Sequence, residues 1–317
     1  MKNASIIATS GIRLEPIAGA GGWRSSQAAL SARERSQAQR DNELIIMETT
    51  KRTLPDFEDP PAVETLVAVH FLPLTGWRVV HFGLFWDSIR GSYPSVQVYS
   101  PVISPGTVLR FEAGGTGQPE DCETDPPVRC WFLNPKHTTL IQVQRNCFIH
   151  NWRREPGGEY LHYDVLRPMF LNGWRNFCSF LERQGVSQPR ILRCEVTYVN
   201  HVDRGKGWDS PSDLREVFPS WTGSASGDFL PPPTAVAIQA YYPMRQMDGQ
   251  LEINLQPAIR KTDSKETIQL TVSGQCRPAS RNESDLMAAV DAAREWVVRG
   301  FTDFTSAKMH QIWRRAI

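Results

Sequence analysis

Hydrophobic and polar positions alternate along this chain in a pattern that occurs twice. The pattern predicts a strand, a helix, three strands and a long amphipathic helix over residues 66–183, and the same order again over residues 191–300. Alternation with a period of two is typical of a strand with one buried face, and apolar residues at every third or fourth position are typical of a helix. The sequence therefore predicts a repeated unit of mixed secondary structure.

The first half has turn and stop signals that bound its elements. Arg145 and Asn146 predict a tight hairpin turn, and Gly91 and Gly185 end the two helices. Residues 94–128 are rich in proline and glycine, which predicts a loop with short strands near 97 and at 108–111. The strands are expected at residues 65–72, 129–133, 139–144 and 147–153, and the helices at 79–89 and 164–183.

The second half repeats this order. Ser210 or Ser212 is the expected N-cap of a short helix, the long helix begins after Asn282 or Ser284 and ends at Gly300, and Thr305 is the expected N-cap of a closing helix. The strands are expected at residues 191–200, 234–242, 251–260 and 267–276, and the short helices at 212–218 and 306–314.

This order predicts an α+β fold, with antiparallel sheets and helices packed on one face. We expect two tandem units, residues 47–185 and 186–317, related by a pseudo-twofold axis so that their sheets form a saddle with the helices on its back. Residues 1–46 show no sustained apolar period, which predicts a disordered tail or a start codon assigned upstream of Met47.

Composition narrows the class of protein. The chain is 40% hydrophobic and 22% charged, as in ordinary globular proteins, and its formal net charge of +1 disfavours a dedicated nucleic-acid binder. Six cysteines without a CxxC pattern predict buried thiols in a reducing compartment. No apolar run approaches the roughly 18 residues of a membrane span, and the first residues do not resemble a signal peptide. We therefore predict a cytoplasmic protein that does not bind membranes.

A polar sheet face flanked by aromatic residues is the most suggestive candidate for a binding site. Amides and carboxylates on such a face can recognise hydrogen-bonding groups, although a solvated sheet face shows the same alternation. The stretch 148–154 adds an imidazole, an indole and two guanidiniums at a strand end, where an edge strand protected by charge is the alternative. The predicted ligand-binding residues are Gln142, Gln144, His150, Asn151, Trp152, Arg153 and Glu195.

Two other functions remain open from the sequence. A hydrolase or transferase site can be drawn from Glu195, Asn200, His201 and Arg299, although a buried His201 and an ion pair of Arg299 with Asp303 are structural alternatives. Trp152, Arg153 and Arg154 are the residue types that bind single-stranded nucleic acid by stacking and charge.

Known reaction motifs are missing from the sequence. Residues 223–227 resemble a nucleophile elbow but hold Ala225 where serine is required. Residues 115–117 lack the third glycine of a dinucleotide loop, and the seven histidines form no HxH or HExxH pattern. The sequence therefore predicts no metal and no cofactor.

Five segments carry a resemblance to a known family. They are residues 54–65 (LPDFEDPPAVET), 81–90 (HFGLFWDSIR), 140–154 (LIQVQRNCFIHNWRR), 194–202 (CEVTYVNHV) and 294–313 (REWVVRGFTDFTSAKMHQIW). In this order they resemble the signature segments of a sporadically distributed prokaryotic family of uncharacterised proteins. The resemblance implies a start near Met47 and a mobile or defence-linked locus, and it supplies no catalytic residue.

Together these patterns favour a non-catalytic cytosolic binding protein. We expect it to contact a partner protein or a small polar ligand through the polar sheet face, with the enzyme and the single-stranded nucleic-acid binder as alternatives.

Overall fold

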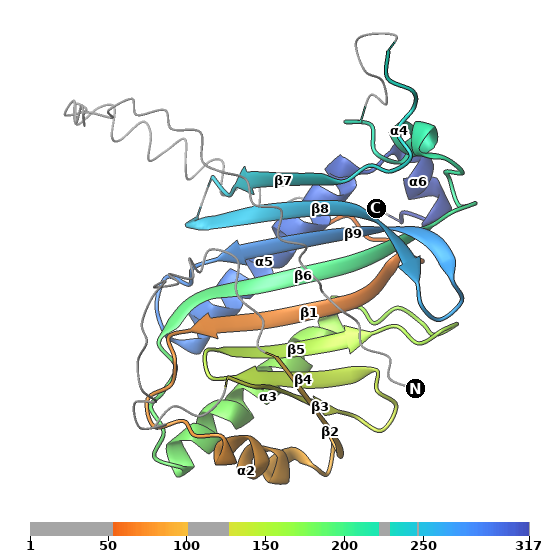
Figure 1. Ribbon diagram of the computed structural model, residues 1–317. Coiled ribbons are helices and arrows are strands. Elements are labelled where there is room, and N and C mark those ends of the chain that lie inside the picture. Colours follow the sequence, from red (N-terminus) through yellow and green to blue (C-terminus); the bar gives the residue numbers. More distant parts are fainter. Residues whose placement is uncertain (1–52, 101–126, 222–228, 246, 317) are drawn as a thin grey trace, which may run out of the picture. The chain divides into compact units, whose positions relative to one another are not determined.

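A single nine-stranded sheet, in the order β2-β3-β4-β5-β1-β6-β9-β8-β7, organises the computed structural model (Figure 1). All its strand pairs are antiparallel. The structure describes residues 53–100, 127–221, 229–245 and 247–316, and residues 53–317 form one unit. The predicted α+β class is confirmed. The expectations for residues 1–46, Met47 and 108–111 lie outside the described residues.

Most elements lie where the alternation predicts them. The strands are β1 (Ala62–Phe71), β2 (Ser95–Tyr99), β3 (Arg129–Leu133), β4 (Thr139–Gln144), β5 (Cys147–Arg153), β6 (Ile191–Asp203), β7 (Ile238–Pro243), β8 (Gly249–Arg260) and β9 (Lys265–Cys276). The helices are α2 (Val80–Ile89), α3 (Tyr163–Arg183), η1 (Pro211–Asp213), α4 (Leu214–Val217), α5 (Glu283–Phe304) and α6 (Ala307–Ile312).

The centre of the sheet joins the two halves of the sequence. β1 pairs with β5 from its own half and with β6 from the other, so that Val67 lies between His150 and Val196. β5, β4 and β3 follow on one side, and β9, β8 and β7 on the other. The predicted halves therefore share one hydrogen-bonded sheet.

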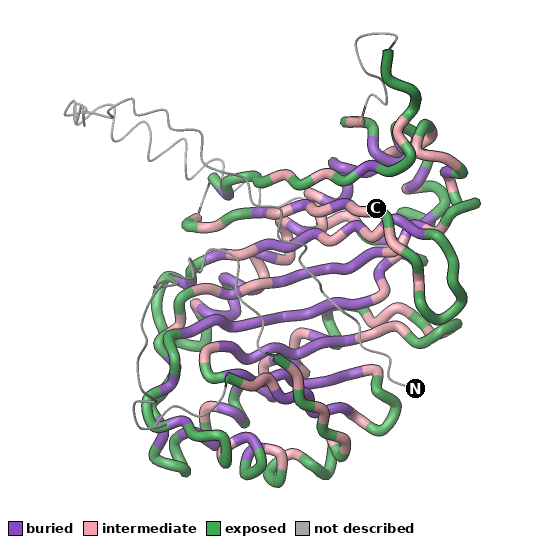
Figure 2. The backbone as a smooth tube through the Cα atoms, in the orientation of Figure 1, coloured by how far each residue is buried: buried purple, intermediate pink, exposed green. Residues whose placement is uncertain are grey.

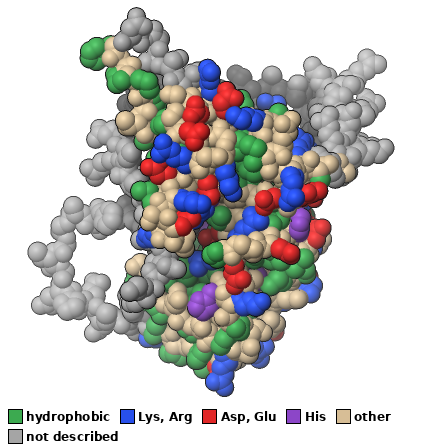
Figure 3. All heavy atoms as spheres, turned by 90° about the vertical axis from the view of Figure 1, so that its right-hand side faces the viewer, with side chains coloured by type: hydrophobic (Ala, Val, Ile, Leu, Met, Phe, Trp, Pro, Cys, Tyr) green, Lys and Arg blue, Asp and Glu red, His purple; other side chains and the backbone are tan. Residues whose placement is uncertain are grey.

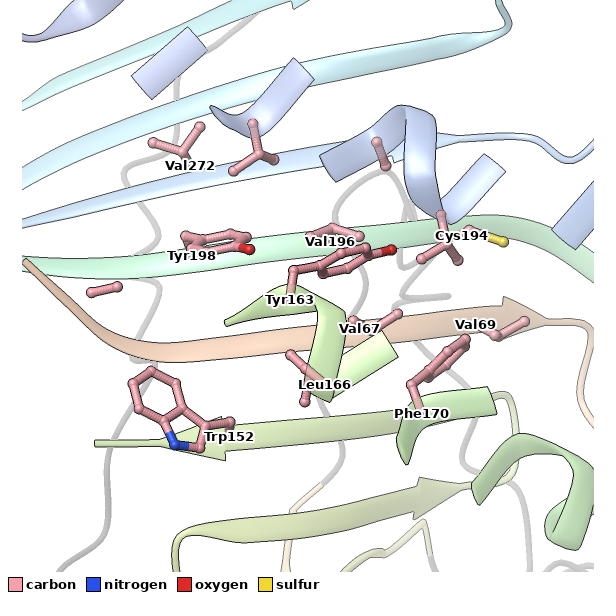
Figure 4. Packing of buried hydrophobic residues seen from close by; sticks show 14 of the residues in the cluster. Val67, Val69, Trp152, Tyr163, Leu166, Phe170, Cys194, Val196, Tyr198 and Val272 are labelled. Atoms are coloured by element: carbon pink, nitrogen blue, oxygen red, sulfur yellow. The ribbon is translucent and has the colours of Figure 1, made fainter. Parts of the chain in front are cut away.

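The long helices α3 and α5 cover one face of this sheet, which we call the first face (Figure 1). Leu166 and Phe170 of α3 lie over Val67 and Val69 of β1, and the core continues to Val196 of β6 (Figure 4). Such buried apolar contacts supply the main favourable free energy of folding.

Polar contacts between α3 and α5 fix the two helices side by side. Arg167 donates two hydrogen bonds of 2.8 Å to the Asp291 carboxylate, and the Tyr163 hydroxyl donates a third, also of 2.8 Å. A second bidentate pair joins Arg175 and Glu283 near the other end. Bidentate arginine–carboxylate pairs restrict orientation, so they favour one arrangement of α3 relative to α5.

Helix α5 continues past Gly300, so the predicted stop there is wrong. Gly300 packs directly on the Leu251 side chain of β8, and a Cβ at this position would collide with it. The glycine is therefore explained by close packing of helix on sheet. Gly274 of β9 has the same role, because a Cβ there would lie 2.6 Å from the carbonyl oxygen of Ala293 in α5.

The caps around α5 and α6 follow from side-chain hydrogen bonds. Asn282 caps α5 as predicted, accepting from the Asp285 amide at 2.7 Å. The predicted N-cap of α6 is wrong by one residue, because the Thr305 hydroxyl donates to the Phe301 carbonyl and so closes α5. Ser306 caps α6 instead.

We predict that Gly274→Ala lowers the free energy of unfolding by about 1–3 kcal/mol, because the added methyl group pushes α5 away from β9. Gly83→Ala in α2 is the matched control, since no atom other than its chain neighbours and the backbone of its own helix lies within 4 Å of the position that its Cβ would take. The control should raise the free energy of unfolding by about 0.5–1 kcal/mol through helix propensity. Urea denaturation of both variants measures the difference, and equal effects would contradict the close packing.

Candidate functional site

The sheet face opposite α3 and α5, which we call the second face, differs from a simple solvated surface. Figure 2 shows the central strands buried along most of their length, and every residue of β4 is buried. Apolar side chains such as Leu66, Ile149 and Leu140 form small clusters there. Strands with apolar residues on both faces are typical of sheets covered on both sides.

A chain of polar side chains crosses the second face from β3 to β1. The Arg129 Nη1 donates to Gln142 Oε1 at 3.3 Å, and Gln142 Nε2 donates to Asn151 Oδ1 at 2.8 Å. The Asn151 Nδ2 in turn donates to Glu64 Oε1 at 2.7 Å, which also accepts from Arg153 Nε at 3.2 Å. Gln142, Asn151 and Glu64 are buried, so each amide orientation is fixed by its neighbours.

Trp131 of β3 lies between the guanidiniums of Arg129 and Arg153, the first and last members of this series of hydrogen bonds. The Cζ atoms of Arg129 and Arg153 lie 5.2 and 4.5 Å from its ring centroid. The Tyr99 ring packs against the Trp131 ring at 4.2 Å between centroids. Burial lowers the pKa of Arg129, but the guanidinium stays charged at neutral pH.

A second polar cluster surrounds Glu195 of β6. The carboxylate contacts His70 Nε2 at 2.8 Å and accepts from Thr197 Oγ1 at 2.8 Å and Gln275 Nε2 at 3.2 Å. Ser273 Oγ lies 3.3 Å away. Burial raises the pKa of Glu195, but its hydrogen bonds and the positive charges nearby lower the pKa by more. Glu195 is therefore an ionised, fully hydrogen-bonded anchor.

Several buried N–H donors on the second face have no acceptor in the part of the chain that the structure describes. The buried Nε of Arg129, Nε1 of Trp131, and Nε and Nη2 of Arg193 have no hydrogen-bond partner among the described residues. A buried donor without an acceptor costs about 1–3 kcal/mol. The second face thus combines a hydrogen-bonded polar framework with buried donors that have no acceptor among the described residues.

The structure separates the predicted ligand-binding residues. Gln142, Gln144, Asn151, Arg153 and Glu195 lie on the second face. His150 and Trp152 belong to the first face, because successive residues of a strand point to opposite sides.

His150 and Trp152 have structural surroundings. The His150 Nε2 lies 3.2 Å from the Tyr93 hydroxyl, and burial lowers the pKa of His150 to about 4. Trp152 is part of the core and packs edge-to-face on Tyr160 with ring centroids 5.5 Å apart. Figure 4 shows its ring on the side of α3.

The four residues of the alternative catalytic site are not brought together. Asn200 points to the first face, where its amide donates to the Leu270 carbonyl. Arg299 forms an ion pair with Glu295 within α5 at 2.8 Å. Glu195 and His201 share the second face but lie six residues apart on one strand, which is roughly 20 Å.

The residues expected to stack nucleic acid bases are also engaged elsewhere. Trp152 is buried, Arg153 pairs with Glu64, and Arg154 donates to Asp59, Pro60 and Gly158. Figure 3 shows basic and acidic side chains interspersed on the face that lies at the right of Figure 1. Interspersed charges do not form the basic footprint of a nucleic-acid binder.

Sequence reasoning missed Glu64, His70, Arg129 and Ser273. Their partners lie on other strands, and the β1–β6 register that brings Glu64 and Glu195 onto one face cannot be read from local periodicity. One feature of the sequence does indicate that the second face is buried. The segments of β4 and β5 mix apolar and amide residues, and such a mixture is typical of strands that are buried on both faces.

Comparison of the chain with protein-family models, with curated proteins and with solved structures finds no match. Among the described residues, no group of three His, Cys, Asp or Glu side chains is placed to hold a metal ion. Within the same residues, no helix has the length and apolar character needed to cross a membrane.

We predict that His150 makes stability depend on pH. Its pKa falls from 6.5 to about 4 on folding, so the unfolded chain binds a proton in this range that the native protein does not. The free energy of unfolding should therefore fall between pH 7.5 and pH 4.5 by about 2–3 kcal/mol more in the wild type than in His150→Gln. Denaturant titration at both pH values measures this, and parallel curves would contradict a neutral, buried His150.

Proposed function

We propose that this protein is a non-catalytic binding protein whose second face binds a partner that presents carboxylate or carbonyl oxygens. The observation that carries the proposal is the set of buried donors on Arg129, Trp131 and Arg193 that lack acceptors among the described residues. Such donors are unfavourable in the free protein and are relieved when a partner supplies acceptors. A partner protein and a small polar ligand both fit this chemistry.

The charge of the second face supports an anionic group on the partner. Arg153 is neutralised by Glu64, and Glu195 contacts His70. Arg129 and Arg193 have no carboxylate within ion-pair distance among the described residues. Guanidiniums prefer planar, bidentate acceptors, so a carboxylate is the favoured group.

The Glu195–His70 pair is the nearest approach to reaction chemistry, and its surroundings argue against catalysis. Both carboxylate oxygens accept hydrogen bonds, and the pKa of Glu195 lies below its ordinary value. A general base works best with a pKa near the operating pH, so this carboxylate is a weak base. Its role in the proposal is to hold His70 and the β6–β9 side chains in place.

We also propose that the sheet arose from two tandem copies of one strand-helix-three-strand-helix unit, related by a pseudo-twofold axis between β1 and β6. The strand order supports this, because β3-β4-β5-β1 meets β6-β9-β8-β7 with corresponding strands at equal distances from the centre. We further propose that the protein is cytoplasmic and belongs to the sporadically distributed prokaryotic family that its sequence resembles.

The proposal predicts different effects on the free energy of unfolding for two similar substitutions on the second face. Arg153→Met should lower the free energy of unfolding by about 1–2 kcal/mol, because it leaves Glu64 without a charged donor in a partly exposed pair. Arg193→Met should leave the free energy of unfolding unchanged or raise it, because two of its buried donors have no acceptor among the described residues. Urea denaturation distinguishes the two.

The affinity for the partner is a second test, independent of stability. Tagged wild-type protein captures a partner from lysate of the native host, and calorimetry with the purified partner measures affinity. Arg193→Met should weaken this affinity about tenfold or more, whereas exposed Arg183→Gln should leave it unchanged. Equal affinity for Arg193→Met and wild type, or turnover of the bound molecule, contradicts the proposal.

A further inference from the structure

A small cavity lies on the first face, where β1 and β6 meet α5 and the segment at residues 55–60. It measures about 50 Å³ and is lined by both polar and apolar side chains. Ala62, Val297 and Phe301 form its apolar wall, and Tyr160, Tyr198 and Arg294 bring polar atoms to it. None of these residues belongs to the second face, so the cavity is separate from the site proposed above.

Arg294 is the charged group of this cavity. Its guanidinium lies over the Tyr163 ring, with Cζ 4.5 Å from the centroid, and its Nε is buried without an acceptor among the described residues. Asp291, one turn earlier in α5, is occupied by Arg167 and Tyr163. No carboxylate in the described part of the chain forms an ion pair with Arg294.

Tyr160 and Tyr198 bring phenolic hydroxyls to the cavity. Burial, and then the neighbouring Tyr198, raise the pKa of Tyr160 well above its ordinary value, so its hydroxyl keeps its proton at neutral pH. The Asn200 amide donates to the Leu270 and Tyr198 carbonyls, and Asn200 also lines the cavity. A guanidinium with phenolic hydroxyls is a donor set for an anion.

Size and charge narrow the ligand. Because one water needs about 10–15 Å³ of such volume, the cavity of about 50 Å³ holds roughly three to five non-hydrogen atoms. The exposed Asp56 carboxylate also lines the cavity, which disfavours a dianion such as phosphate. The apolar wall suits a short hydrocarbon group.

We propose that this cavity binds a small monocarboxylate, with the carboxylate on Arg294 and the tyrosine hydroxyls and a short alkyl group against Val297 and Phe301. Distant parts of the sequence converge on it. Residues 55–62, 198–200 and 294–301 fall within three of the five segments that carry the family resemblance.

Sodium propionate is the probe that tests the proposal. Saturation-transfer NMR on the full chain should show saturable binding, and Arg294→Gln should weaken it about tenfold or more through loss of the charged hydrogen bonds. Arg299→Gln is the matched control, since it is an arginine of the same helix outside the cavity lining; it should bind propionate as the wild type does. Inorganic phosphate should not compete.

The Arg294→Lys variant distinguishes a loss of propionate binding from a loss of folding. It retains the charge over Tyr163 but loses the planar fork, so it should fold with a melting temperature near that of the wild type and bind propionate more weakly. Non-saturable propionate signals, equal binding by wild type and both Arg294 variants, or competition by phosphate would each overturn the assignment. Such a result leaves the second-face proposal unaffected.

Discussion

The antiparallel pairing of β1 with β6 is the interaction on which the rest of the structure depends. It joins the strand that opens the first half of the chain to the strand that opens the second, from the Ala62–Asn200 pair to the Phe71–Ile191 pair. On the second face this pairing brings Glu64 and Glu195 onto one continuous surface. On the first face it brings Ala62 beside Asn200, and both residues line the small cavity.

The two faces of the sheet at this β1–β6 pairing, which we call the seam, are stabilised by different interactions. The first face buries apolar side chains under α3 and α5, and two bidentate arginine–carboxylate pairs hold those helices together. The second face buries amides and carboxylates that satisfy one another across strands. A buried polar network is stable only when each member has a partner. The donors left without acceptors on Arg129 and Arg193, among the residues that the structure describes, are therefore the informative exceptions, since native proteins leave few such groups.

Local signals predict the elements well and their packing poorly. The bounds of β3, β4 and β5 agree with the predicted strands because the Arg145-Asn146 turn and the alternation around it are local. The stop predicted at Gly300 is wrong because the reason for this glycine, contact with Leu251, is tertiary.

The candidate site is likewise predictable only where local signals in the sequence determine it. Alternation places Gln142 and Glu195 opposite the apolar side chains of their own strands, but that both share one face with Asn151 follows from the register of the sheet. His150 and Trp152 are grouped with them in the prediction because they are neighbours in sequence, although alternation directs them to the other face. The cavity at Arg294 cannot be foreseen from the sequence, because its lining comes from segments separated by more than two hundred residues, and only the sheet register brings them together.

Hydrogen exchange of the backbone amides tests most directly whether the β1–β6 seam makes one cooperative sheet. The amides of Ile141 and Val67 on one side of the seam and of Val196 and Ile253 on the other should all exchange with the free energy of global unfolding, within about 1 kcal/mol. If the β6–β9–β8 strands exchange at a clearly lower free energy while β1, β5 and β4 stay protected, the halves unfold independently. Such a result contradicts the seam as the element that positions both sites.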